Sequence, residues 1–402
     1  MIRLSKILLY FTAAFLLAWL LPWFYNFLTT RPNNTPFTLY SCITQNFASI
    51  EVHQGNIIRR DESGKTYTDK EFDSILPLFY YRQLMVDGRN PDTLYGKALT
   101  PQSVSMQSFI FRHNPSDINK VKPKLYPLLE SMSGRVDLEM PDDVFRIDNR
   151  IEFIDMATNR VNESKSERFT RSLIDKGFQF PARYVQGNPT VQKEYDEGYM
   201  LIDSKGELFH LKQVKGRPHI KHIDLPDSIQ PADLFVTEFS DRRSYAFLSD
   251  ARHQFYVITK PEYALRRLPV DSFDPHSETM LIIADPLNWT VNISSDVTDR
   301  YYALDAESHK LVDTLSYPIV EKLGSKIGRW IFPFELTFTS YEDEYVYPRI
   351  DDISIRALWL NLILASVYFM WRRKRLRHIA ADTAGIIVLG IFLFIPLWVL
   401  RR

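Results

Sequence analysis

Three apolar segments at the two ends of the chain constrain its fold most strongly. Residues 7–25 carry no charge, follow Arg3 and Lys6, and run into a group of aromatic residues. Two further apolar runs, 357–371 and 384–400, close the sequence. Because a helix of roughly 20 apolar residues crosses the hydrocarbon core of a bilayer, this pattern predicts one N-terminal and two C-terminal transmembrane helices.

The charged residues beside these segments predict their orientation. The basic stretch 372–378 (RRKRLRH) lies between the two C-terminal runs, and loops of this kind stay in the cytoplasm. Aromatic residues, and not a small-residue cleavage site, follow the first apolar run, which favours an uncleaved anchor over a signal peptide. Residues 29–355 are therefore expected on the far side of the membrane, although Arg401 and Arg402 then fall on that side too.

Small and polar residues within the apolar segments mark candidate helix–helix contacts. Ala14 and Ala18 form a small-xxx-small pair, and Asn361 and Ser366 are polar groups in the second segment. Two explanations remain open. These residues serve packing among the three helices of this chain, or they contact a second membrane protein.

The charge of the middle of the chain excludes one class of function. Of 49 basic residues, ten lie in or beside the terminal segments, where Asp382 is the one acid, so residues 29–355 hold 39 bases and 48 acids. A domain with a formal charge of −9 lacks the basic footprint of a nucleic-acid binder. With a single cysteine, Cys42, the chain can form no intramolecular disulfide.

Repeated hairpin patterns predict that the middle is mainly β. Alternating apolar and polar residues flank polar turns near Asp155, Asp203, Ser249 and Asp305, which are 48, 46 and 56 residues apart. Four-stranded propeller blades recur at about 40–50 residues, so we expect a propeller-like arrangement, with a β-sandwich or barrel as the alternative.

The same patterns suggest a division of the chain into four parts. Residues 1–28 form the anchor and 356–402 the C-terminal helix pair. Residues 151–355 form the repeated-hairpin domain, and residues 29–150 hold mixed strands and a helix. That helix is expected to begin at Thr68 or Asp69 and to bend at Pro77.

A run that follows this helix is the strongest candidate for a recognition surface. Tyr80 and Tyr81 lie in an aromatic cluster flanked by Arg82 and Arg89, and charged residues among aromatics can anchor a partner. The alternative is that the tyrosines are core residues and the arginines pair with nearby acids such as Asp87.

No motif for catalysis, cofactor binding or metal binding is present. The sequence Ser63–Thr66 (SGKT) resembles the end of a phosphate-binding loop, but the required earlier glycine is Arg59, so an ordinary hairpin turn is expected. His219 and His222 would face opposite sides of a strand and could not chelate together. We therefore expect no catalytic residues, no cofactor and no metal.

Three features together resemble those of a known protein family. They are the run Leu76–Leu84 followed by Asp87–Asp92, the N-terminal anchor, and the two C-terminal helices. In these features the chain resembles the domain-of-unknown-function 4857 family of envelope proteins from Bacteroides-type Gram-negative bacteria. The resemblance implies an inner-membrane protein with residues 29–355 in the periplasm. It also implies an association with ATP-binding-cassette transport systems, and it supplies no catalytic residues.

Two functional hypotheses follow. In the first, the chain is a non-catalytic inner-membrane protein with a periplasmic binding platform. It serves as an accessory subunit or sensor of an ATP-binding-cassette transport assembly, and its partners are the bilayer and a membrane protein such as an ATPase or permease. In the second, it is a membrane-tethered periplasmic hydrolase of glycans or peptides, whose acids come from separate repeats. The first predicts an exposed apolar patch, and the second predicts a pocket where carboxylates converge.

Overall fold

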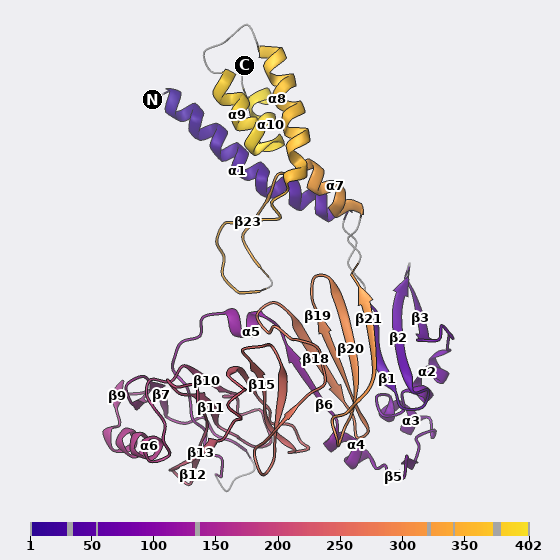
Figure 1. The fold of residues 1–402 in the computed structure, drawn as a ribbon, viewed down its shortest axis with the longest axis vertical. Helices are drawn as coiled ribbons and strands as arrows, with labels where there is room; N and C mark the ends of the chain where they lie inside the picture. The colour runs from indigo at the N-terminus through magenta and orange to yellow at the C-terminus, as the bar shows by residue number, and fades with distance from the viewer. Residues whose placement is uncertain are drawn as a thin grey trace. The chain divides into compact units, whose positions relative to one another are not determined.

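The chain folds into two compact units, which a computed structural model describes over residues 2–29, 35–53, 55–132, 137–319, 323–340, 342–372 and 379–400. One unit, Thr35–Tyr317, contains most of the strands, and we call it the β unit. The other, Met1–Asn34 with Pro318–Arg402, contains the long helices, and we call it the helical unit (Figure 1). Segment 318–355, assigned above to the hairpin domain, lies in the helical unit.

Antiparallel sheets make up the β unit. A three-stranded sheet comes first along the chain, with β1 (Phe37–Ser41), β2 (Asn46–His53) and β3 (Asn56–Asp61). Another holds β7 (Asp143–Ile147), β8 (Ile151–Asp155) and β9 (Arg160–Val161). Two four-stranded sheets follow. The first consists of β10 (Tyr184–Gly187), β11 (Tyr199–Ile202), β12 (Leu208–Val214) and β13 (Arg217–Ile223). The second consists of β14 (Pro231–Val236), β15 (Ser244–Asp250), β16 (Phe255–Thr259) and β17 (Ala264–Arg267).

A five-stranded sheet completes the set and joins distant parts of the sequence. Its strands are β18 (Thr279–Ala284), β19 (Asn288–Ser294), β20 (Thr298–Asp305) and β21 (Leu311–Pro318), with β6 (Phe109–His113) paired to β18. β6 comes about 170 residues before its neighbour, so this pairing closes a long loop of chain.

The sheets pack face to face in an order that the buried side chains define. Cores lie between the β7–β9 and β10–β13 sheets, between the β10–β13 and β14–β17 sheets, and between the β14–β17 and five-stranded sheets. A fourth core, which includes Phe47 and Tyr301, joins the β1–β3 sheet to the five-stranded sheet. The strands of these two sheets lie side by side in Figure 1. The result is a row of five sheets, with the N-terminal sheet against the C-terminal one.

Short helices also occur in the β unit, so it is mixed and not purely β. They are α2 (Asp69–Ile75), α3 (Tyr81–Val86), α4 (Pro101–Gln107), α5 (Ser116–Asn119) and α6 (Glu163–Asp175), and a small hairpin pairs β4 (Thr93–Leu94) with β5 (Lys97–Ala98). Thr68 caps α2 as expected, because its side chain accepts the N–H of Glu71 and the Glu71 carboxylate accepts the N–H of Thr68. Pro77 lies beyond the end of α2, so it separates α2 from α3 and does not bend one helix.

The expected hairpins are present, and turn aspartates hold two of them in the same way. Asp203 Oδ1 accepts the N–H groups of Lys205 and Glu207 at 2.8 and 2.9 Å. Asp250 Oδ1 accepts those of Arg252 and Gln254 at 2.9 and 2.8 Å, so Asp250, and not Ser249, is the equivalent of Asp203. These carboxylates serve their own turns.

The same kind of turn follows β3. Asp61 Oδ1 accepts the N–H of Lys65, and Gly64 has a left-handed φ of 85°. The phosphate-loop-like SGKT sequence is therefore an ordinary turn, as predicted.

The helical unit differs from the expected arrangement. α1 (Ile2–Thr29) is, within the described residues, the one helix long and apolar enough to cross a membrane, and it is consistent with a membrane anchor or a signal sequence. α8 (Leu358–Arg372) has 15 residues and follows the 3₁₀ turn η1 (Ile355–Ala357). α7 (Leu323–Ile331) and a small hairpin of β22 (Glu335–Thr337) and β23 (Arg349–Asp351) precede them.

The prediction of a single transmembrane helix over 384–400 is wrong. The segment forms α9 (Ile379–Leu389) and α10 (Ile391–Val399), which are separated at Gly390. Gly390 has a φ of 55°, and a Cβ there would meet Asn361 Oδ1 at 2.2 Å, so close packing against α8 requires this break. Neither helix, nor α8, has the length of a membrane span. The basic residues 373–378 and Arg401–Arg402 lie outside the described residues.

Candidate functional site

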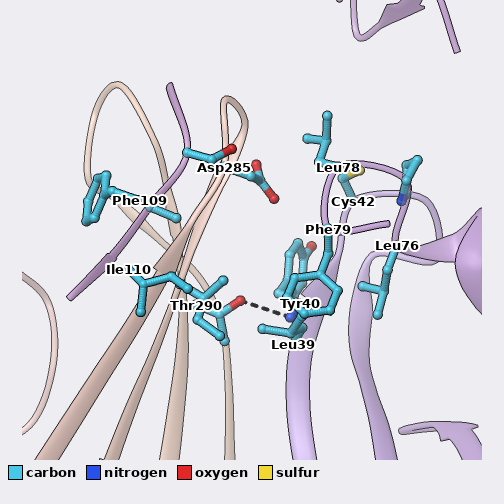
Figure 2. Close-up of a pocket in the computed structure, with 14 residues that line it drawn as sticks. Leu39, Tyr40, Cys42, Leu76, Leu78, Phe79, Phe109, Ile110, Asp285 and Thr290 are labelled. Atoms are coloured by element: carbon cyan, nitrogen blue, oxygen red, sulfur yellow. Dashed lines mark hydrogen bonds between the residues drawn. The ribbon is translucent and has the colours of Figure 1, made fainter. Parts of the chain in front are cut away.

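A cavity of about 460 Å³ lies in the β unit between the β1–β3 sheet and the five-stranded sheet (Figure 2). Four segments form it: the end of β1, the run 76–79 between α2 and α3, the start of β6, and the turn from β18 to β19. Apolar side chains dominate its walls. The lining residues are Leu39, Tyr40, Cys42, Leu76, Pro77, Leu78, Phe79, Ser108, Phe109, Ile110, Ile283, Ala284, Asp285 and Thr290.

Buried hydrogen bonds hold the walls in place. The backbone N–H of Tyr40 in β1 donates to Thr290 Oγ1 in β19 at 3.0 Å, which ties the two sheets together at the cavity (Figure 2). Ser41 Oγ donates to the carbonyl of Ile75 at 2.5 Å and so fixes the end of α2, just before the run 76–79. Hydrogen bonds thus tie the lining segments to one another and to α2, which suits a preformed ligand site.

Asp285 is the one charged residue among the described residues that line the cavity. Its Oδ1 accepts the N–H groups of Leu287 and Asn288 at 2.7 and 2.8 Å. Burial raises the pKa of Asp285 to about 6, and these hydrogen bonds and the nearby Lys97 only partly oppose that rise. A carboxylate in apolar surroundings favours a ligand that brings a hydrogen-bond donor or a positive charge.

Cys42 lies beside this carboxyl, and its thiol has a raised pKa. Burial, followed by the negative charge of Asp285, raises the pKa of the Cys42 thiol to about 11. The thiol therefore stays protonated, whereas a catalytic cysteine needs a lowered pKa. The described lining includes neither a histidine nor a second carboxyl that could complete an acid–base pair. The described lining offers an apolar surface with one carboxyl, which suits the binding of a ligand.

The structure places Tyr80 and Tyr81 beside the cavity but largely inside the protein. Tyr81 is buried, with its hydroxyl 3.5 Å from the carbonyl of Leu99. Tyr80 is half-buried and packs edge-to-face on Phe72 and Phe79, and burial raises the pKa of Tyr80. Of this aromatic run, Phe79 is the residue that is both exposed and part of the cavity wall.

The two arginines of the predicted recognition surface have different environments. Arg82 is exposed on α3. Arg89 pairs with Asp87 at 2.6 Å and donates to the Lys70 carbonyl and to Ser74 Oγ, each at 2.9 Å, so it fastens the loop after α3 to α2. A recognition role for Tyr80, Tyr81, Arg82 and Arg89 stays a prediction.

The candidate helix contacts lie in the helical unit. Ala14 and Ala18 are buried, and Ala18 belongs to a cluster with Phe332, Leu336 and Phe392 of the same chain. Asn361 is buried and donates to the carbonyl of Ile387 at 3.0 Å, whereas Ser366 is exposed. Contacts of Ala18 and Asn361 within this chain are thus present, and contacts with a second protein stay a prediction.

Sequence analysis missed the cavity and its carboxyl. Asp285 comes just before a turn, as Asp203 and Asp250 do, and most of its apolar surroundings come from segments more than 170 residues earlier in the chain. No local signal separates it from the other turn aspartates. Within the described part of the chain, no group of three or more His, Cys, Asp or Glu side chains is arranged to hold a metal ion.

Comparison with known sequences identifies the family. Residues 37–304 match the family described as Domain of unknown function (DUF4857). The chain belongs to this family. The match covers the β unit almost completely, including every segment that lines the cavity, and the family description assigns no activity. No curated protein matches the sequence.

Solved structures are similar only at a distance. PorZ of Porphyromonas gingivalis, a bacterial surface component of the type-IX secretion system, is 12% identical, with a TM-score of 0.22; the match covers 71% of this chain and 32% of PorZ. The Dos1 propeller is 11% identical (TM-score 0.27; 73% and 63% covered). The WD40 domain of SCAP from fission yeast is 10% identical (TM-score 0.27; 77% and 76% covered). The chain thus spans less than two thirds of the length of PorZ and of the Dos1 structure.

Proposed function

We propose that this DUF4857 protein is a non-catalytic, membrane-anchored binding protein of the bacterial inner membrane. In this proposal the β unit is a propeller-like platform in the periplasm, and the protein is an accessory subunit or sensor of an ATP-binding-cassette transport assembly. The observation that carries the binding role is the preformed apolar cavity with a single carboxyl, Asp285. The ligand or partner group expected there is apolar and carries a hydrogen-bond donor or a positive charge.

The surface of the helical unit supports the membrane anchor. α1 exposes large apolar side chains along its length, among them Phe11, Leu16 and Phe24, and α8 exposes Trp359, Ile363 and Met370. Exposed apolar side chains at this density are unfavourable in water and are typical of a surface that contacts lipid. We therefore propose that α8, α9 and α10 lie in the bilayer beside α1, although none of them is long enough for an ordinary span.

The first test is a pull-down of the tagged full-length protein in mild detergent, with identification of co-purifying chains by mass spectrometry. We expect an ATP-binding-cassette ATPase or permease in near-stoichiometric amount. A protein that purifies alone would overturn the role as a transporter subunit.

Matched variants connect this partner to the cavity. Phe79 and Ile110 are exposed side chains in its wall, so a Phe79→Ala, Ile110→Ala double variant is expected to reduce partner recovery several-fold. Val86→Ala is the control, because Val86 is an exposed apolar residue of α3 that does not line the cavity. Equal recovery with the double variant and the control would exclude the cavity as the contact site.

One observation keeps the periplasmic hydrolase as a second candidate. A polar groove of about 620 Å³ between the β10–β13 and β14–β17 sheets contains Asp233, Glu207 and Asp227. Burial raises the pKa of Asp233 despite the opposing effect of His276, whose Nε2 is 3.5 Å away. Hydrolysis of glycan or peptide substrates by the full-length protein, lost in an Asp233→Asn variant, would support this candidate over the binding protein.

A further inference from the structure

α7 is a short helix that the sequence analysis did not anticipate, and one of its faces is apolar and exposed. Leu323, Ile327 and Trp330 leave 73%, 44% and 49% of their surface accessible. Their spacing of four and three residues places them on one side of the helix. Such a row is unfavourable in water, which indicates that lipid or another molecule covers it.

A neighbouring side of α7, which carries Gly324 and Gly328, is fixed to the C-terminal end of α1. Tyr25 Oη donates to the carbonyl of Gly324 at 2.9 Å. A Cβ at Gly324 would lie 3.0 Å from the side chain of Thr29, and a Cβ at Gly328 would lie 3.2 Å from the ring of Tyr25. The two glycines therefore allow the backbone of α7 to lie directly on the last turns of α1 (Figure 1).

The length of α1 gives the depth at which this contact occurs. Tyr25 comes 18 residues after Ile7, where the apolar run begins, a rise of about 27 Å at about 1.5 Å per residue. The hydrocarbon core of a bilayer is about 30 Å thick. If α1 spans the bilayer from residue 7, then Tyr25 and Thr29 lie where the hydrocarbon meets the headgroups. The exposed aromatic residues Trp23, Phe24 and Phe27 fit that depth, because aromatic side chains are enriched at this interface.

We infer that α7 is an interfacial helix, which lies in the headgroup region of the bilayer with Leu323, Ile327 and Trp330 inserted toward the acyl chains. Both α1 and α7 expose large apolar side chains, so the same lipid phase can cover both. Lys326, at the edge of the row, is exposed and can reach lipid phosphates while its stem lies along the apolar surface. This inference rests on the proposed anchoring by α1, and it adds a second, surface-bound contact with the membrane.

Spin labels on the full-length protein in lipid nanodiscs test the inference. In a Cys42→Ser background, single cysteines are placed at Ile327 and at Trp330, and accessibility to oxygen, which enriches in lipid, is compared with accessibility to a water-soluble nickel chelate. We expect oxygen-to-nickel ratios several-fold higher at both positions than at Lys326→Cys, the adjacent residue at the edge of the row. Thr314→Cys, exposed on β21, provides the aqueous reference.

The remaining outcomes overturn the inference in distinguishable ways. High nickel accessibility at Ile327 and Trp330 would place the row in water. Low accessibility to both reagents would mean that protein covers the row, either a second copy of the chain or another subunit. A label at Leu16→Cys on α1 separates the two proposals. Lipid exposure at Leu16 without lipid exposure at α7 would refute the interfacial helix alone, and water exposure at Leu16 would refute the membrane anchor as well.

Discussion

Two pairs of neighbouring sheets in the β unit differ in the polar groups between them. Between the β10–β13 and β14–β17 sheets, buried charges are paired. Lys193 bonds Asp196 at 2.8 Å and Glu238 at 2.6 Å, and Glu197 bonds both Lys212 and Lys260. Between the β1–β3 and five-stranded sheets, the single carboxyl of Asp285 faces an apolar cavity.

The pKa values of Glu197 and Asp285 differ in direction, although burial still raises the pKa of Glu238 beside Lys193. Burial alone would raise the pKa of Glu197, but hydrogen bonds from Lys212 and Lys260 lower it below the ordinary value. At Asp285 burial dominates, and the pKa rises to about 6. A carboxylate with partners within the chain stabilises the fold, whereas one without a cationic partner leaves binding capacity for a ligand. A buried carboxylate of the second kind marks where a binding site can lie, because an unpaired charge is retained at a cost in stability.

Removal of Glu197 is expected to give the largest effect. Glu197→Ala leaves the ammonium groups of Lys212 and Lys260 without their buried partner, so we expect a loss of about 3–5 kcal/mol in the free energy of unfolding. Urea denaturation of the full-length protein in detergent, followed by the near-ultraviolet signal of the β unit, measures this loss. The control is Glu307→Ala, which removes an exposed carboxylate paired with Lys97 at 2.8 Å and should change stability little. Equal effects of the two substitutions would show that the buried network does not stabilise the contact between the sheets.

The contribution of Asp285 to stability should depend on pH with the opposite sign to the contribution of Glu197. The pKa of this carboxyl is about 6 in the folded chain, against 3.8 for the ordinary group, so between these values the folded state binds a proton that the unfolded state does not. Stability contributed by that proton is complete below the unfolded pKa and is lost as pH rises through 6. Glu197, with its lowered pKa, instead contributes stability above its unfolded pKa that is lost as pH falls through its folded pKa.

Asp285→Asn isolates this contribution. A shift of about two pKa units corresponds to about 3 kcal/mol, so the wild type should lose up to this amount, relative to the variant, between about pH 4 and pH 7.5. The measurement is the difference in the free energy of unfolding between the two proteins across that pH range. A difference that does not change with pH would mean that the Asp285 carboxyl is hydrated and that the cavity does not have the apolar character assigned to it.

Sequence patterns predicted the elements of this protein better than their assembly. The turns at Asp203 and Asp250 and the cap at Thr68 depend on atoms a few residues apart, so local chemistry was sufficient to locate them, apart from a one-residue error at Ser249. The division of 384–400 into α9 and α10 could not be predicted, because it depends on the approach of Asn361 to Gly390 across the helical unit.

The candidate site shows the same limit. The sequence predicts a recognition surface at Tyr80 and Tyr81, but their side chains are mostly directed into cores, and the neighbouring run 76–79 lines the cavity instead. Asp285 meets this run only because β6 pairs with β18 and β1 packs on β19. α7 did carry a local signal in the spacing of Leu323, Ile327 and Trp330, but nine residues with two glycines do not suggest a helix.

The reactivity of Cys42 is expected to show the smallest effect of these tests, but it reports directly on the cavity. Because Cys42 is the single cysteine of the chain, any thiol modification reports on this site alone. Burial and the charge of Asp285 hold the pKa of the thiol at about 11, so modification by a small neutral methanethiosulfonate should be slow at pH 7.5 and accelerate with each unit of pH. Asp285→Asn removes the negative charge, lowers the pKa of the thiol, and should increase the rate at pH 7.5 a few-fold. Asp203→Asn, a comparable change in a turn that does not line the cavity, should leave the rate unchanged. If both variants react at the wild-type rate, the carboxyl of Asp285 does not act on Cys42, and the cavity lacks the charged end to which we assign its selectivity.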